Sequence, residues 1–208
     1  MNDTIAAHYR KLLHDHGDSP AAAQYSSRES QERRFAALAS IGDLRGARLL
    51  DYGCGTGHLL TFLCEQGIAP GQYTGVDIVE ELLEVGRNKH RGARFCALES
   101  VANEKFDYIF VSGVFNNRRR DNRQYYQATV GDLFARCERG LAFNMMSTWV
   151  DYRDPGLFYE SPERAFRFVK QEVTPFVTLR HDYEVKPGVI PFEFAIYAYR
   201  HACELRVR

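Results

Sequence analysis

Apolar residues along the chain alternate between two patterns. Short apolar runs bounded by glycine, asparagine or charged residues predict strands at residues 47–50, 73–78, 94–98, 106–111 and 141–146. Between them, apolar residues that recur at helical spacing predict helices at residues 27–40, 59–67, 80–89 and 121–137. Strands that alternate with helices in this way predict an α/β fold with a mostly parallel sheet.

Both ends of the chain depart from this alternation. Residues 1–16 predict a polar helix, so residues 1–44 are expected to form a helical cover ahead of a core at 45–208. After a helix that starts at Ser161, residues 177–185 and 192–200 predict two more strands. The Lys-Pro-Gly segment between those strands is too short for a parallel crossover, which predicts an antiparallel hairpin. No linker interrupts residues 1–208, and we expect a single domain.

A glycine-rich segment follows the first predicted strand. Residues 49–57 read Leu-Leu-Asp-Tyr-Gly-Cys-Gly-Thr-Gly, with glycines at alternate positions between a strand and a helix. Such glycines let the backbone approach a ligand closely, because no side chain is in the way. The dinucleotide pattern G-x-G-x-x-G requires a glycine where this chain has His58 or Leu60, so it does not match. A P-loop is excluded as well, because no Gly-Lys-Ser/Thr follows.

Two acidic residues accompany these glycines. Asp51 stands two positions before Gly53, and Asp77 ends the second predicted strand. This ordered pair of motifs resembles the class I S-adenosylmethionine (SAM)-dependent methyltransferases. The resemblance implies a Rossmann-like three-layer sandwich with seven strands in the order 3-2-1-4-5-7-6, the seventh antiparallel. It also implies that Asp77 accepts hydrogen bonds from both ribose hydroxyls, although a helix N-cap role for Asp77 stays open.

The resemblance extends to a set of cofactor-binding residues, with S-adenosylhomocysteine (SAH) as the product. The implied residues are Asp51, Tyr52, Gly53, Cys54, Gly55, Gly57, Asp77, Ile78, Leu98, Glu99, Ser112, Gly113, Val114, Gln31 and Arg34. Among them, Leu98 is expected to cover the adenine ring and Glu99 to accept from its amine, unless Glu99 is a plain strand-end residue. Arg34 is expected to hold the methionine carboxylate, which an arginine fork matches; a solvated helix face is the alternative.

The acceptor should bind near the loops after strands four and five, because ligands of open α/β sheets lie outside the carboxyl ends of the strands. The basic run 116–123 makes Asn116, Arg118 and Arg119 candidates for an acceptor with a carboxylate or another anionic group. A hydrated helix start is the alternative interpretation. Trp149 and Tyr152 are candidates for an apolar pocket wall with polar handles, or for a lid.

Two residues are candidates for catalytic work. His181, beside Asp182 and Tyr183, is a possible general base for an amine or hydroxyl, although a strand histidine is more often structural. Tyr25, just ahead of the second helix, is the other candidate. The segment 112–115 reads Ser-Gly-Val-Phe where nucleic-acid amino-methyltransferases carry Asn/Asp-Pro-Pro-Tyr/Phe, and this disfavours methylation of a nucleobase amine.

Composition narrows the expected partners. The chain balances 27 Lys and Arg against 27 Asp and Glu, which disfavours a nucleic acid or an anionic membrane as partner. Apolar runs are far too short to span a bilayer, the N-terminus lacks a secretory pattern, and five scattered cysteines form no Cys-x-x-Cys pair. These features predict a cytoplasmic protein, and no residue spacing predicts a metal site. We therefore predict a SAM-dependent methyltransferase of a small molecule with an oxygen or nitrogen nucleophile; a protein or RNA acceptor and a non-catalytic SAM-binding module are the alternatives.

Overall fold

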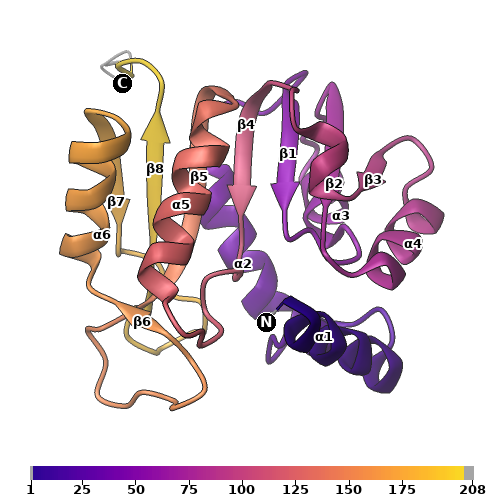
Figure 1. Cartoon of the computed structure of the whole chain (residues 1–208), viewed down its shortest axis with the longest axis horizontal. Coiled ribbons are helices and arrows are strands. Elements are labelled where there is room, and N and C mark those ends of the chain that lie inside the picture. The colour runs from indigo at the N-terminus through magenta and orange to yellow at the C-terminus, as the bar shows by residue number, and fades with distance from the viewer. Residues whose placement is uncertain (1, 204–208) are drawn as a thin grey trace.

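Eight strands form one sheet in the computed structural model, which describes residues 2–203 (Figure 1). The strands are β1 (Arg48–Tyr52), β2 (Gln72–Val76), β3 (Arg94–Cys96), β4 (Phe106–Val111), β5 (Cys137–Ser147), β6 (Tyr159–Glu160), β7 (Phe176–Arg180) and β8 (Glu193–Tyr199). Their order is β3-β2-β1-β4-β5-β8-β7, with β6 paired to β5. Only β8 runs antiparallel to its neighbours. The predicted order and the predicted antiparallel strand are confirmed, and β6 is an addition.

Helices cover both faces of this sheet (Figure 1). The helices are α1 (Asn2–His16), η1 (Pro20–Ala23), α2 (Arg28–Ala39), α3 (His58–Glu65), α4 (Glu80–Lys89), η2 (Leu98–Val101), α5 (Asn122–Ala135), α6 (Pro162–Phe168) and η3 (Val169–Val173). α5 and α6 pack on one face, and α2, α3 and α4 contribute to the core on the other. The arrangement is the expected three-layer α/β fold. None of these helices is long and apolar enough to cross a membrane, within residues 2–203.

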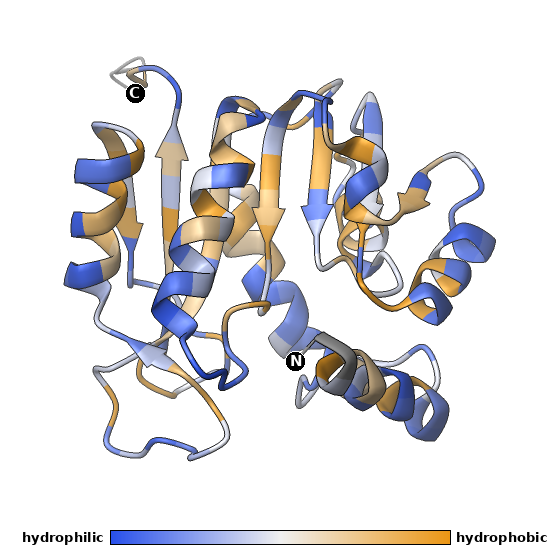
Figure 2. Cartoon of the chain, in the orientation of Figure 1, coloured by the Kyte–Doolittle hydropathy of each residue, from blue (hydrophilic) through white to orange (hydrophobic). Residues whose placement is uncertain are grey.

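The central strands are buried on both faces because their side chains alternate between two cores. Leu50 of β1 and Leu141 of β5 belong to the core beneath α5, whereas their neighbours Leu49 and Ala142 belong to the core beneath α2 and α3. Figure 2 shows this pattern as apolar strands between helices whose outer sides are polar. The continuous apolar runs in the sequence therefore correspond to strands with helices on both sides.

The C-terminal hairpin differs from the prediction in its connection. β7 ends at Arg180 and β8 begins at Glu193, so residues 181–192 form a long irregular connection instead of extended strands with a tight turn. Pro187 and Pro191 lie in this connection and cannot donate a backbone hydrogen bond to a ladder. His181 consequently lies just outside the strand in which it was predicted.

The N-terminal segment lies beyond the carboxyl ends of the strands, and Figure 1 shows α1 below β1 and β2, extending toward α4. Polar contacts attach it there: Arg10 of α1 pairs with Glu81 of α4 at 2.5 Å, and Asp18 accepts hydrogen bonds from Thr56 at 2.5 Å and from Lys89 at 2.9 Å. The edge of the sheet at which α/β proteins bind ligands is therefore bordered by α1.

Candidate functional site

The glycine loop between β1 and α3 requires its glycines for conformational and steric reasons. Gly53, Gly55 and Gly57 all have positive φ angles, of 76°, 54° and 77°. A Cβ on Gly53 would lie 2.4 Å from Cγ2 of Val114. A Cβ on Gly57 would overlap the ring of Phe95, and Gly57 begins α3 without lining the cavity described below. Gly53 and Gly55 therefore bring backbone to the cavity. Gly57 instead adopts the left-handed conformation that is needed at the start of α3.

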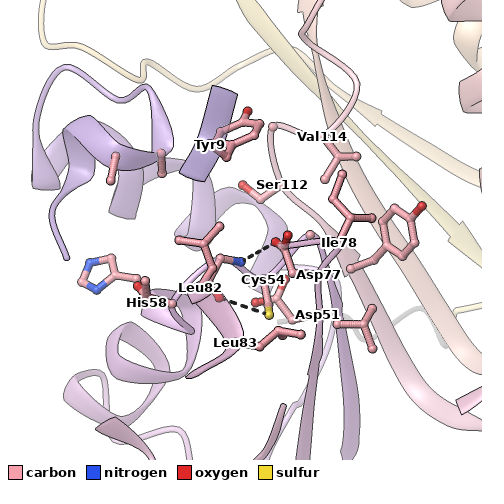
Figure 3. Close-up of a pocket in the computed structure, with 18 of the residues that line it drawn as sticks. Tyr9, Asp51, Cys54, His58, Asp77, Ile78, Leu82, Leu83, Ser112 and Val114 are labelled. Atoms are coloured by element: carbon pink, nitrogen blue, oxygen red, sulfur yellow. Dashed lines mark hydrogen bonds between the residues drawn. The ribbon is translucent and has the colours of Figure 1, made fainter. Parts of the chain in front are cut away.

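Asp77 connects the two sequence motifs. One oxygen of its carboxylate accepts a hydrogen bond from the Gly55 amide at 2.9 Å (Figure 3). The other oxygen accepts from the Val79 amide at 3.0 Å. Burial raises the pKa of Asp77, and hydrogen bonds from backbone amides oppose that shift. The carboxylate thus holds the glycine loop and the start of α4, and it also lines the cavity.

Asp51, at the end of β1, is a second carboxyl group beside the first. It is buried and accepts a hydrogen bond from the Tyr73 hydroxyl at 2.5 Å. Burial raises the pKa of Asp51 to about 7; the hydrogen bond from Tyr73 lowers it, and the negative charge of Asp77 raises it further. Two desolvated carboxyl groups at one end of the cavity favour a ligand that carries positive charge.

A cavity of about 720 Å³ extends over the carboxyl ends of β1, β2 and β4. The predicted residues that line it are Tyr25, Gln31, Asp51, Tyr52, Gly53, Cys54, Gly55, Asp77, Ile78, Leu98, Glu99, Ser112, Gly113, Val114 and Arg119. Its apolar part includes Leu82 and Leu83 of α4, beside Ile78 (Figure 3). The side chain of Ile78 is 53% exposed, which leaves an apolar surface on which a flat ring can pack.

The turn after β4 is held by a buried polar network. The Gly113 amide donates to Oδ1 of Asn144 at 2.8 Å, and the Asn144 amide donates to Glu193 at 2.8 Å. Above the turn, the Tyr25 hydroxyl lies 3.5 Å from Oγ of Ser112, and a Cβ on Gly113 would lie 2.6 Å from that hydroxyl. β5, β8 and the segment before α2 thus fix the shape of this turn together.

Arg34 has a different role from the one predicted. Its guanidinium forms a buried ion pair with Glu193 of β8 at 2.5 Å and donates to Ser30 at 2.7 Å. It lies below the ring of Tyr25, with Cζ 4.9 Å from the ring centre, and does not line the cavity. The prediction that Arg34 holds a ligand carboxylate is wrong, because the guanidinium of Arg34 already donates to the carboxylate of Glu193.

The predicted catalytic histidine also lies away from the cavity. Nε2 of His181 is 3.1 Å from the carbonyl oxygen of Pro191, and its ring packs against Phe194. His181 does not line the cavity, because β7 ends at Arg180 and the irregular connection begins at His181. The environment favours a structural role for His181.

Four of the predicted acceptor residues do not line the cavity either. Asn116 is engaged by the backbone amide of Met146, and Arg118 projects outward to the carbonyl of Leu157. Trp149 is 64% exposed and Tyr152 is 73% exposed, because the segment between β5 and β6 extends away from the cavity mouth. Arg119 is the predicted acceptor residue that does reach the cavity.

Sequence reasoning missed three residues that line the cavity beside Arg119. Tyr9 of α1 accepts a hydrogen bond from the Asn117 side chain at 2.8 Å, and Tyr125 of α5 packs beneath Arg119. Tyr9 is far from the motifs in sequence, and nothing in a polar helix indicates which side chain turns inward. For Asn117 and Tyr125, their positions after the fourth strand were the available signal.

Comparison with known proteins assigns the chain to a family. Residues 43–160 match the family described as a methyltransferase domain. No curated protein sequence matches the chain. Because the family match covers more than half of the chain, the protein belongs to the class I SAM-dependent methyltransferases.

Solved structures show the same fold at low sequence identity. Magnesium protoporphyrin IX methyltransferase (ChlM) from Synechocystis PCC 6803 with bound SAH is 16% identical over 96% of each chain, with a TM-score of 0.65. The plantazolicin methyltransferase BpumL, in complex with SAH, is 10% identical over 95% of this chain and 97% of that one, with a TM-score of 0.62. The Pnkp1/Rnl/Hen1 RNA repair complex is 14% identical over 82% of this chain and 42% of the other, with a TM-score of 0.61.

The cavity fits the cofactor of this family, which is SAM. The donor set suits it: the Asp77 carboxylate faces the cavity as an acceptor for a diol, and Ile78 and Leu98 offer apolar surface for an adenine ring. Gly53 and Gly55 bring backbone to the cavity wall, where no side chain of theirs keeps a ligand away. The protein is a SAM-dependent methyltransferase by family and fold, and the residues that line its cavity fit SAM.

Proposed function

We propose that the protein transfers a methyl group from SAM to a small molecule whose nucleophile is an oxygen or a nitrogen. The observation that carries this proposal is the continuity of the cavity, which runs from the cofactor motifs past Ser112 and Gly113 to Tyr9 and Arg119. α1 borders this second part and is attached to it by the hydrogen bond between Tyr9 and Asn117. A space bordered by a helix on this side suits a small molecule better than a polymer.

The residues of the chain would divide the work along the cavity. When bound, SAM would supply a methyl group on a sulfonium: the carbon–sulfur bond breaks with its electron pair on sulfur, which gives SAH, and the acceptor oxygen or nitrogen forms the new bond and releases its proton to water. Asp77 would accept hydrogen bonds from the ribose, and Ile78 and Leu98 would cover the adenine, with Glu99 near its amine. Gln31, which lines the cavity where Arg34 does not, would face the methionine end.

Tyr25 is the residue that we propose to contact the acceptor nucleophile. Its hydroxyl lies over the Ser112–Gly113 turn, beside the end of β4. Burial raises the pKa of Tyr25, so the phenol stays protonated at neutral pH. Tyr25 would therefore orient the nucleophile through a hydrogen bond and exclude water, and no general base is required for a leaving group as good as a sulfonium.

The alternatives differ in what they require of the site. A non-catalytic SAM-binding module has no need for an acceptor space beyond the cofactor motifs, whereas this cavity continues past them. A protein or RNA acceptor would need access across α1, and the formal net charge of zero supplies no general attraction to RNA. Both features support a small-molecule acceptor.

Calorimetry with SAH tests the cofactor site. Wild-type protein should bind SAH, and Asp77→Ala should lower the affinity roughly 10- to 100-fold, because hydrogen bonds to a charged group contribute about 1.5–3 kcal/mol. Asp132→Ala is a matched control, since Asp132 is an exposed carboxylate of α5 outside the cavity. A wild-type protein that does not bind SAH would contradict the proposed function at its first step.

Label transfer from methyl-labelled SAM tests the acceptor class. Wild-type protein is incubated with the small-molecule, RNA and protein fractions of a cell extract, and label should enter the small-molecule fraction. Tyr25→Phe should lower the rate of label transfer while SAH affinity stays within about twofold. Label that enters only RNA or protein would refute the small-molecule proposal while leaving the methyltransferase assignment intact.

A further inference from the structure

The side chain of Arg119, in the basic run after β4, reaches the cavity, whereas those of its neighbours do not. Arg118 and Arg120 are exposed, whereas Arg119 is partly buried and lines the cavity. Its guanidinium lies over the ring of Tyr125, with Cζ 3.8 Å from the ring centre. The stacked ring fixes the plane of the guanidinium and leaves its edge for a ligand.

Among the residues that the structure describes, no acidic side chain pairs with Arg119, unlike two other cations that line the cavity. Arg28 is bound by Glu32 and Glu65, and Lys89 is bound by Asp18. Within residues 2–203, the Arg119 side chain donates no hydrogen bond, and its Nε is fully buried without an acceptor. A buried guanidinium donor without a partner is costly, and an anionic ligand that accepts a charge-assisted hydrogen bond would offset that cost.

Polar groups around Arg119 complete the arrangement. Tyr9 and Asn117 hydrogen bond to each other at the same end of the cavity. Burial raises the pKa of Tyr9 to about 12, and the positive charge of Arg119 acts against that shift, as it does for Tyr52. The tyrosines are therefore neutral at pH 7 and do not neutralise the guanidinium, which leaves the charge of Arg119 for a ligand.

We propose that the acceptor carries an anionic group, such as a carboxylate, which binds to the edge of the Arg119 guanidinium, while a separate oxygen or nitrogen of the same molecule receives the methyl group. This inference rests on the proposed function and narrows it from a small molecule to an anionic one. Tyr9, Tyr52 and Tyr125 surround the charge with aromatic side chains, which suits a planar acceptor.

A carboxylate at Arg119 has one other source, the methionine part of the cofactor. The two sources are distinguished by calorimetry with SAH and with 5′-methylthioadenosine, which lacks the amino-acid carboxylate. If Arg119 binds the acceptor, Arg119→Gln should bind both compounds within about twofold of wild type. A loss of at least tenfold for SAH alone would assign Arg119 to the cofactor and overturn the proposal.

The acceptor arm uses label transfer from methyl-labelled SAM to a small-molecule cell extract, followed by a quaternary-ammonium column at about pH 11, where a methylated amine is uncharged. The wild-type product should be retained, because its anionic group is not the methylated one. At limiting extract, Arg119→Gln should lower the rate about 10- to 100-fold, as expected for the loss of charge-assisted hydrogen bonds. Arg119→Lys should recover part of the rate, and Arg118→Gln, which alters the exposed neighbour, should match wild type.

The outcomes separate the two proposals. Labelled product in the column flow-through, or equal rates for Arg119→Gln and Arg118→Gln, would overturn the anionic acceptor and leave methyl transfer to a small molecule standing. Binding of SAH without any labelled small molecule would overturn the proposed function, and the anionic acceptor with it. Thermal unfolding of each variant, within a few degrees of wild type, shows that the loss of rate is not a loss of fold.

Discussion

Asp51 and Asp77 show how the fold of a cofactor loop shifts the chemistry of single residues. Both carboxyl groups end neighbouring parallel strands, and both are desolvated by the loop that they support. Backbone amides donate hydrogen bonds to Asp77, whereas within residues 2–203 only the Tyr73 hydroxyl is a close donor to Asp51. Asp51 is thus a desolvated carboxyl group with few hydrogen-bond donors at the place where a cationic cofactor is expected to bind. This should lower the unfolding free energy of the ligand-free protein.

The unfolding free energy should depend on pH through Asp51. Its pKa is about 7 in the fold against 3.8 for an aspartate in water, so between these values the folded state holds a proton that the unfolded state has lost. Stability should therefore fall as pH rises from about 4 to 7, by up to about 1.4 kcal/mol per pH unit for this group, and then level off. Urea unfolding at several pH values should show that Asp51→Asn lacks this component, whereas Asp132→Asn keeps it. Parallel curves for Asp51→Asn and wild type would refute the raised pKa.

Gly53 offers a second test at a single position. Gly53 and Gly46 have similar positive φ angles, 76° and 68°, but only at Gly53 would a Cβ meet another atom closely, Cγ2 of Val114. Gly46→Ala should cost about 1–2 kcal/mol of unfolding free energy from backbone strain alone. Gly53→Ala should lower the unfolding free energy by more than Gly46→Ala does. Adding Val114→Ala to Gly53→Ala should recover that extra loss, because it removes the atom that the new Cβ would meet. Urea denaturation measures the unfolding free energy of the three variants. Equal losses for Gly46→Ala and Gly53→Ala would show that the contact between the new Cβ and Val114 is relieved without cost.

Among the secondary-structure elements, α2 and β8 depend on one buried ion pair. Arg34 of α2 and Glu193 of β8 are 8% and 1% exposed, and Glu193 also receives a hydrogen bond from Asn144 of β5. Asn144 in turn accepts from the Gly113 amide, so the pair connects the C-terminal strand to the turn that borders the cavity. A residue predicted to bind the ligand directly instead supports the wall of its site.

Removal of one partner of this pair should be costly. Glu193→Gln should lower the unfolding free energy by about 3–5 kcal/mol, because it leaves the Arg34 charge buried without its counter-ion. Glu29→Gln is the control, since Glu29 forms an exposed pair with Arg33 of the same helix, and it should cost at most about 1 kcal/mol. Chemical denaturation compares the two variants. Similar losses would indicate that water or rearrangement compensates Arg34.

For the whole molecule, the N-terminal segment decides how enclosed the site is. α1 is attached to the rest of the protein by few polar contacts, among them Arg10 with Glu81 and Tyr9 with Asn117. Tyr9 lines the cavity from α1, opposite the glycine loop, so a ligand that fills the cavity contacts both (Figure 3). Bound ligand should therefore hold α1 in place.

Hydrogen exchange measures this effect directly. SAH should slow amide exchange in α1, in residues 17–25 and in the glycine loop, because ligand binding removes their local opening. β7, at the far edge of the sheet, serves as an internal control and should exchange at the same rate with and without SAH. Protection confined to the glycine loop would show that α1 moves independently of the cofactor.

Local patterns in the sequence predicted much of the fold. The period of the apolar positions and the residues at turns are local properties, so the alternation of strands and helices, the glycine loop and the acidic residue ending the second strand were predictable from neighbouring residues. The strand order followed from the resemblance to the methyltransferases. The long connection after Arg180 and the added β6 were missed, because proline positions and short pairings depend on the register of distant strands.

Side-chain directions were decided by tertiary contacts. Nothing near Arg34 in the sequence indicates Glu193, which lies far along the chain and reaches it only because β8 inserts beside β5. Likewise, the run of arginines after β4 predicted a cluster of charge, and packing on Tyr125 selected Arg119 as the one of Arg118, Arg119 and Arg120 that lines the cavity. Backbone conformation and cofactor class follow from short-range sequence, whereas the partner of each long side chain depends on which elements the fold brings together.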